Sequence, residues 1–120
     1  MARTIPTAQV VGMATKLAAG KATFTCTLTN SAETTCAIPF GDFAFGQIRN
    51  HSGGTLAITW HDADSATGTA GACEDEYGAA VTQSIATAKS QKFHEALAGC
   101  DWLLPVIASG SASVSVTLKR

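Results

Sequence analysis

The sequence predicts an all-β protein, built as an antiparallel β-sandwich of the jelly-roll type with an N-terminal arm. Apolar and polar residues alternate in several short segments, and turn residues separate these segments at regular spacing. Helical spacing is confined to short stretches. At 120 residues the chain has the size of a single domain. We therefore divide it into an arm, residues 1–20, and a β-sandwich domain, residues 21–120.

The clearest strand covers residues 21–29, KATFTCTLT, where threonines alternate strictly with apolar side chains. Residues 30–33 form a predicted turn, so residues 34–38 are expected to return as the hairpin partner of this strand. The loop at residues 50–54, NHSGG, then separates two later strands.

Seven further segments show strand patterns, for a total of seven to nine strands. They cover residues 43–49, 55–61, 69–76, 81–86, 90–93, 101–108 and 112–119. The last two are expected to pair across Ser109-Gly110-Ser111, and residues 93–97 are expected to make one helical turn before Gly99. Alternation predicts the following core: Phe24, Leu28, Ile48, Ile58, Trp60, Trp102, Leu104, Val114, Val116 and Leu118.

Charge and hydropathy argue against nucleic acids and against membranes as partners. The net charge is −1 and the eight basic residues are scattered, so no basic stripe is present to follow a nucleic-acid backbone. No apolar run has the length of a membrane span, and the first residues lack a signal-peptide pattern. We expect the protein to stay where it is made, or to leave only within an assembly.

The four cysteines show no Cys-x-x-Cys spacing of the kind found in zinc knuckles or redox motifs. Without a secretory signal, reduced and buried thiols are the default expectation. Cys26 and Cys36 flank the first predicted turn, so geometry permits a disulfide between them without requiring one.

The segment HDADS, residues 61–65, raises the question of a metal site. A calcium loop starting at Asp62 is supported by Asp64, but Ala66 replaces a ligand and Cys73 stands where the final acid belongs. A looser oxygen site with the acidic residues 74–76 is the less favoured alternative. We interpret HDADS as a strand end, and we expect no metal and no cofactor.

No catalytic residue is predicted. The three histidines, His51, His61 and His94, are widely spaced, and residues 110–114 lack the final glycine of a nucleophile elbow. Trp60 and Trp102 lie within predicted strands and are expected to be buried, as in a structural protein. Tryptophans displayed on the surface are typical of a sugar-binding module instead.

Four segments in the carboxyl-terminal two-thirds of the chain form a recognisable arrangement: Thr59-Trp60, residues 77–82 (YGAAVT), residues 96–102 (ALAGCDW) and residues 114–119 (VSVTLK). This arrangement resembles small all-β virion proteins of tailed phages, in particular head decoration (cement) proteins. It rests on turns and core residues and includes no catalytic motif.

This resemblance implies a structural protein of the virion that assembles in the host cytoplasm and stabilises the head by protein–protein contacts. Its implied partner is the major capsid protein or another virion protein, and the chain is expected to form a homo-oligomer. The arm is apolar for a free tail, so we expect five of its residues to bind the neighbour: Ile5, Val10, Val11, Met13 and Leu17. The competing interpretation is a carbohydrate- or receptor-binding β-sandwich module of a tail fibre.

Overall fold

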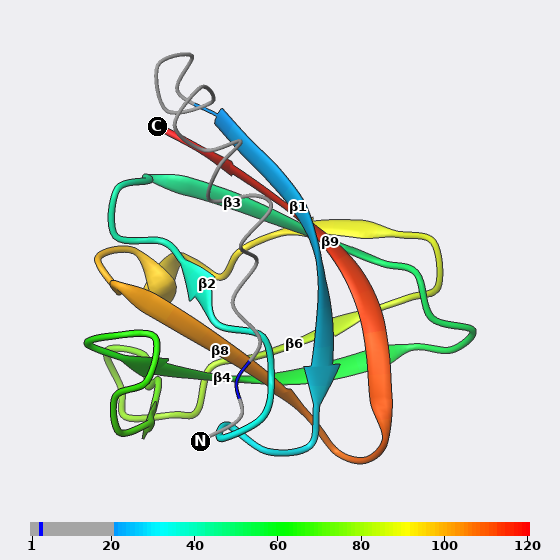
Figure 1. Cartoon of the computed structure of the whole chain (residues 1–120), viewed down its shortest axis with the longest axis horizontal. Coiled ribbons are helices and arrows are strands. Elements are labelled where there is room, and N and C mark those ends of the chain that lie inside the picture. The colour runs from blue at the N-terminus through cyan, green and yellow to red at the C-terminus, as the bar shows by residue number, and fades with distance from the viewer. Residues whose placement is uncertain (1–2, 4–20) are drawn as a thin grey trace.

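The structure, a computed structural model, describes residue 3 and residues 21–120. Residues 21–120 form one nine-stranded sheet that curls into a half-barrel (Figure 1). The strands are β1 (Lys21–Thr29), β2 (Ile38–Pro39), β3 (Phe45–Asn50), β4 (Leu56–Ala63), β5 (Gly71–Ala72), β6 (Thr82–Ile85), β7 (Ser90–Lys92), β8 (Trp102–Ile107) and β9 (Ser111–Lys119). A single 3₁₀ turn, η1 (Glu95–Leu97), precedes β8. The predicted arm lies outside the described residues, apart from Arg3.

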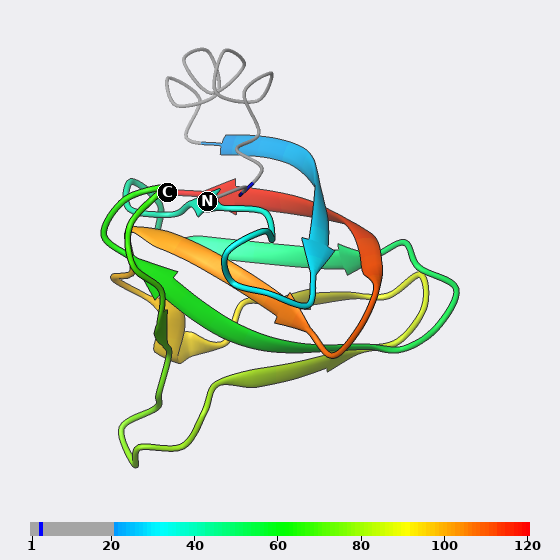
Figure 2. The same ribbon diagram turned by 60° about the horizontal axis from the view of Figure 1, so that its bottom comes forward.

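The all-β prediction is confirmed, whereas the antiparallel sandwich is not. All nine strands belong to a single sheet, with the order β5-β4-β8-β1-β9-β3-β7; β2 also pairs with β8, and β6 with β4. The sheet is mixed, because β1 runs parallel to β8 through the pair Thr29↔Val106. Figure 2 shows how the sheet wraps around its own concave face. The curl therefore encloses the core that the prediction assigned to two facing sheets.

Strand β1 occupies the centre of the sheet, and this position contradicts both predicted hairpins. It pairs along its whole length with β9, from Lys21↔Lys119 to Thr29↔Ser111, and so separates β9 from β8. The predicted partnership of residues 101–108 with 112–119 is therefore wrong. Residues 34–38 do not pair with β1 as predicted either, because their strand, β2, pairs with β8. The turn at residues 30–33 is confirmed by the bond from Thr34 N to Ser31 O, 3.1 Å.

Alternation correctly identified the side chains that face the interior. Phe24, Leu28, Ile48 and Val116 are buried in the main core, and Trp60 at its centre is fully buried. The remaining predicted core residues are buried as well, with Trp102 as the exception. Trp102 is only half-buried, because it lies on the outer face of the sheet beside a small cluster of Ala37, Ala63 and Leu104. The core prediction is therefore confirmed for nine of its ten residues, although Leu104 is buried in the outer cluster and not in the main core.

The two ends of the curled sheet meet where β6 approaches β7, and amide side chains join them. Gln83 Nε2 donates to Gln91 Oε1 (3.1 Å) and to Lys92 O (2.9 Å), and Gln91 Nε2 donates to Ser84 O (2.5 Å). The main chains of these strands pair elsewhere, β6 with β4 and β7 with β3. We call this set of side-chain bonds the closing seam, because it ties together the two ends of the curled sheet.

Gln83 also connects the seam to the core. Its Oε1 accepts from Trp60 Nε1 and from the backbone N–H of His94, both at 3.0 Å. The ring of Phe93 packs against Trp60 with a centroid distance of 5.1 Å. One amide thus satisfies a buried indole donor and a backbone donor that would otherwise lack partners.

A buried asparagine joins the strands at one end of the barrel. Asn50 is fully buried, and its Nδ2 donates to Gly54 O and to Ile85 O, each at 2.8 Å. Its Oδ1 accepts from Ser52 N at 2.7 Å. Because the buried amide is fully hydrogen-bonded, it stabilises the ends of β3 and β6 instead of penalising the core.

The weaker sequence patterns gave shorter elements than predicted. Residues 69–76 contribute only the two-residue strand β5, followed by a projecting turn closed by the bridge Glu74↔Ala80 (Figure 2). The predicted helical turn at residues 93–97 is η1, which begins after His94 and ends before Ala98.

We predict that Gln83→Ala lowers the free energy of unfolding by about 2–4 kcal/mol, because it leaves the Trp60 indole and the His94 N–H without acceptors. Urea denaturation measures this loss. Gln47→Ala is the matched control, since Gln47 is exposed on β3 and should change stability by less than about 0.5 kcal/mol. Equal losses in the two variants would contradict a structural role for the closing seam.

Candidate functional site

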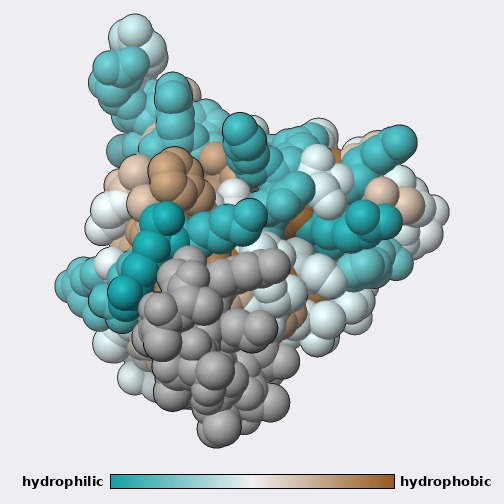
Figure 3. All heavy atoms as spheres, turned by 90° about the horizontal axis from the view of Figure 1, so that it is seen from above, coloured by the Kyte–Doolittle hydropathy of each residue, from teal (hydrophilic) through white to brown (hydrophobic). Residues whose placement is uncertain are grey.

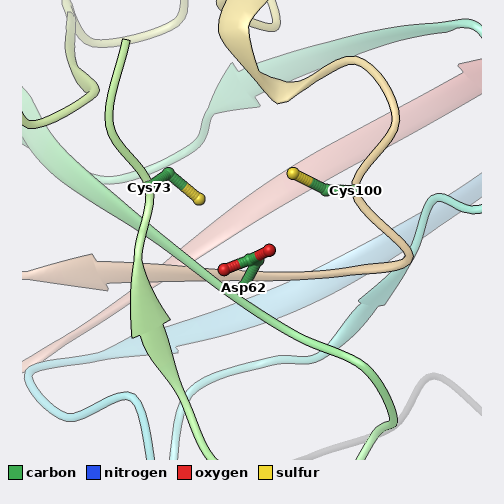
Figure 4. Close-up of side chains that lie close together, drawn as sticks. All are labelled: Asp62, Cys73 and Cys100. Carbon is green, nitrogen blue, oxygen red and sulfur yellow. The ribbon is translucent and has the colours of Figure 1, made fainter. Parts of the chain in front are cut away.

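Three side chains that can act as metal ligands meet at one end of the barrel. They are Asp62 from β4, Cys73 just after β5, and Cys100 from the connection between η1 and β8. Their ligand atoms all lie within 4.8 Å of one another. Figure 4 shows the two thiols pointing toward each other with the carboxylate of Asp62 beside them. We call this group the Asp–Cys–Cys cluster.

The backbone holds each member of the cluster in place. Asp62 lies within the sheet, paired with Gly71 on one side and Leu103 on the other. Cys73 N donates to Trp60 O, and Cys73 O accepts from Val81 N, both at 3.0 Å. Cys100 N donates to Leu97 O at 3.2 Å, which ties Cys100 to η1. The three side chains therefore project from fixed backbone rather than from a free loop.

Electrostatics in the cluster disfavour thiolates. Burial, reinforced by the neighbouring Cys100 and Asp62, raises the pKa of the Cys73 thiol to about 12. The pKa of Cys100 is also raised, first by burial and then by the negative charge of Asp62. Both cysteines are consequently protonated at neutral pH, and neither is an activated nucleophile.

Sequence reasoning missed this cluster because its members are far apart in the chain. Asp62 was weighed as a ligand together with Asp64, but the structure separates them. Asp64 lines a small groove of about 240 Å³ with Asp42 and Asp101. The only signals in the sequence were a carboxylate at a strand end and two cysteines outside the strictly alternating strands. Neither signal indicates that the residues are neighbours.

The three histidines occupy separate places. His51 Nε2 lies 2.6 Å from Ser115 Oγ on the surface of β3 and β9. His94 Nδ1 accepts from Ala96 N at 3.0 Å and so caps η1. His61 neighbours Asp62 on β4, but adjacent residues of a strand point to opposite faces. Among the described residues, no histidine belongs to the Asp–Cys–Cys cluster.

The other two cysteines, Cys26 and Cys36, form a second pair in the main core. Both are buried free thiols. The pKa of Cys26 is strongly raised by its hydrogen bond to Cys36 and by burial. The sequence left a disulfide between them open, and the structure places the two thiols side by side in the reduced form.

A groove of about 520 Å³ lies against the start of β3 and the end of β7. Phe40 and Phe93 form its apolar wall, and their rings meet edge to face at 5.3 Å. Phe45 stands at its rim with 65% of its surface exposed. The polar lining includes Gln47, Lys92, His94, Glu95 and Lys119. An aromatic wall with a polar rim is suited to a small ligand or to a docked side chain.

Hydrophilic residues cover most of the described surface on the face seen in Figure 3, and apolar residues gather there only in a small patch. Phe45 and Tyr77 are the exposed large hydrophobic side chains of the described residues. Tyr77 is 87% exposed at the tip of the turn between β5 and β6.

The predicted partner-binding residues Ile5, Val10, Val11, Met13 and Leu17 lie outside the described residues, so their role stays a prediction. Arg3, from the same segment, contacts the barrel of its own chain. Its Nε donates to Ala32 O (2.7 Å) and its Nη1 to Gly68 O (2.7 Å). These bonds attach Arg3 to the β1–β2 and β4–β5 loops, whose residues Ala32 and Ala70 pack against the outer apolar cluster.

Comparison with known proteins gives structural likeness only. No protein family matches the chain, and no curated protein matches it either. Among solved structures, the SPBc2 prophage-derived protein YomS is similar, with a TM-score of 0.54 and 16% identity over 83% of this chain and 93% of that chain. This likeness shows that the two chains share a fold.

Two further solved structures are also similar in part. HppE with cobalt(II) and substrate has a TM-score of 0.48 and 12% identity over 88% of this chain and 47% of that chain. RmlC from Streptococcus suis has a TM-score of 0.43 and 14% identity over 87% of this chain and 46% of that chain. With TM-scores below 0.5, neither likeness carries a functional argument.

In residues 3 and 21–120, no helical segment has the length and hydrophobicity needed to cross a membrane.

We predict that Asp62→Asn accelerates alkylation of Cys100 several-fold in reduced, chelator-treated protein at slightly alkaline pH. The Asp62 charge raises the thiol pKa, so removing it lowers that pKa and increases the thiolate fraction. Mass spectrometry of iodoacetamide-treated protein measures the rate at each cysteine. Asp64→Asn is the control and should leave the rate unchanged. Equal rates in the wild type and in Asp62→Asn would show that the carboxylate does not act on the thiols.

Proposed function

We propose that this chain is a non-enzymatic structural protein of a phage particle, and that it decorates and stabilises the capsid. The observation that carries the proposal is the likeness to the prophage-derived protein YomS, which extends over 93% of that chain and 83% of this one. This agreement supports a phage origin beside the resemblance to head decoration proteins noted in the sequence.

The physical properties of the barrel suit a decoration protein. Such a protein must keep its shape under internal pressure, and side-chain bonds between β6 and β7 tie the two ends of this curled sheet together. The exposed residues of β1 and β9 are mainly threonine and serine, which keep the surface soluble without strong charge. Many identical weak contacts, repeated by the symmetry of the shell, then supply the strength of attachment.

The proposed partner is the major capsid protein or another virion protein, and the protein itself acts as a homo-oligomer within the virion after assembly in the host cytoplasm. The arm residues Ile5, Val10, Val11, Met13 and Leu17 supply the apolar contacts with this partner. The bonds from Arg3 to the barrel support the proposal, because they hold one residue of this segment against the body of the domain.

The groove beside Phe45 favours a second candidate function, a receptor- or carbohydrate-binding module of a tail fibre. Its volume of about 520 Å³ is within the usual range of small-molecule sites. The exposed ring of Phe45 and the neighbouring polar side chains are the groups that bind sugars through stacking and hydrogen bonds. Of the two tryptophans, Trp60 is fully buried, which supports the structural role, whereas Trp102 is half-buried on the outer face and favours neither function.

We predict that particles assembled without this protein lose their DNA at lower temperature than complete particles, and that adding the purified protein restores the difference. A variant with all five arm residues changed to serine should fold normally but bind particles at least tenfold more weakly. The variant keeps Arg3, so the attachment of the amino end to the barrel is unchanged. Co-sedimentation with particles measures binding, and circular dichroism checks the fold.

Two results would contradict the decoration role. Particles that lack the protein would tolerate heat and osmotic shock as well as complete particles. Alternatively, Phe45→Ala would abolish adsorption to host cells without affecting particle stability, while Tyr77→Ala, the control at a distant exposed aromatic, would change neither. The second result would establish the receptor-binding function instead.

A further inference from the structure

The Asp–Cys–Cys cluster brings together two sulfur ligands and one oxygen ligand from three separate parts of the chain (Figure 4). Asp62 is fixed within the sheet, and Cys73 and Cys100 are fixed by backbone hydrogen bonds at the same end of the barrel. Such preorganisation is needed for metal binding, because the folded chain then holds the ligands before the ion arrives. The spacing of these three residues in the sequence does not predict this preorganised ligand set.

The electrostatics of the cluster suit a cation. Each of the three groups carries negative charge when ionised, and burial together with the charge of Asp62 raises the pKa of both thiols. Among the described residues, the one ion pair joins Arg3 to Glu33, so Asp62 has no basic partner there. A divalent ion at the centre of the cluster would replace the two thiol protons and neutralise most of the accumulated charge.

We propose that Asp62, Cys73 and Cys100 bind a single zinc ion, with water in the fourth position. Two thiolates select a soft ion over calcium or magnesium, which require oxygen ligands. In a tetrahedral zinc site, sulfur lies about 2.3 Å from the metal, so the two sulfur atoms are roughly 3.8 Å apart. The present separations, all within 4.8 Å, reach this geometry through small side-chain rotations.

The position of the Asp–Cys–Cys cluster determines how an ion reaches it and which parts of the chain the bound ion connects. Asp62 and Cys100 are half-buried, so an ion reaches the ligands from solvent without unfolding of the barrel. Once bound, zinc connects β4, the segment after β5 and the connection before β8. This connection stabilises the end of the barrel independently of the proposed capsid function, and it holds whether or not the protein binds a capsid.

The test uses the full-length protein, purified under reducing conditions and stripped of metal with a chelator. We expect one equivalent of zinc to raise the melting temperature by several degrees. Cobalt(II), used as a spectroscopic probe, should give tetrahedral absorption bands and a thiolate-to-cobalt charge-transfer band. Cys100→Ser should abolish the charge-transfer band or greatly reduce it, and Asp62→Asn should weaken zinc binding at least roughly tenfold.

Two controls separate this site from the rest of the chain. Asp64→Asn removes a carboxylate two positions away, and Cys36→Ala removes a buried thiol of the other cysteine pair; both should keep the cobalt spectrum and the zinc affinity. Cys100 is half-buried, so Cys100→Ser is expected to fold even if a substitution at the more buried Cys73 does not. Circular dichroism of each variant confirms the fold before titration.

Three outcomes would overturn the proposal. The first is cobalt binding without a thiolate charge-transfer band, which would place the ion elsewhere. The second is a loss of zinc affinity in Cys36→Ala as large as that in Cys100→Ser. The third is that protein purified with zinc and without reductant loses the mass of two hydrogen atoms and yields a linked Cys73–Cys100 peptide. That result would show that the pair gives up two protons and two electrons to an oxidant such as dioxygen, and that the cluster is a disulfide site.

Discussion

The architecture depends on the hydrogen bonds that Gln83 makes at the closing seam. Strands β6 and β7, at the two ends of the curled sheet, share no backbone ladder and are joined along the chain by the turn at residues 86–89. Gln83 adds side-chain bonds across this junction, to Gln91 and to Lys92 O. The same amide accepts from the buried indole of Trp60, so closure of the barrel and packing of the core are satisfied together. A buried donor that loses its acceptor costs far more than an exposed bond contributes, which makes this single residue disproportionately important.

The sequence predicts which side chains are buried better than it predicts which strands are neighbours. Alternation in residues 21–29 and 112–119 correctly identified two strands and the side chains that they bury, because the period of two reports which face meets the core. Alternation carries no information about neighbours. Both predicted hairpins were therefore wrong, since β1 lies between β8 and β9 through contacts between distant parts of the chain. Trp102 was misplaced for the same reason: its strand packs apolar side chains on both faces.

The candidate site was less predictable than the fold. Asp62 was identified as chemically interesting, but the local pattern suggested Asp64 as its partner, and the structure supplies Cys73 and Cys100 instead. Those thiols come together only because β4, the segment after β5 and the connection before β8 meet at one end of the barrel. The fold thus creates both proposed properties: a rigid body suited to a particle surface, and a preorganised ligand set at its end. The seam underlies both, since it fixes Trp60, whose carbonyl oxygen holds Cys73.

Native-state hydrogen exchange of the Trp60 indole N–H tests the central role of the closing seam most directly. The ladder amide of Val114, in the centre of the β1–β9 pairing, serves as the internal reference for global unfolding. If the seam is part of the cooperative core, the indole proton should exchange only through global unfolding, with the same free energy of opening as Val114. Exchange of the indole at a much lower free energy, while Val114 stays protected, would show that the seam opens independently and does not hold the barrel together.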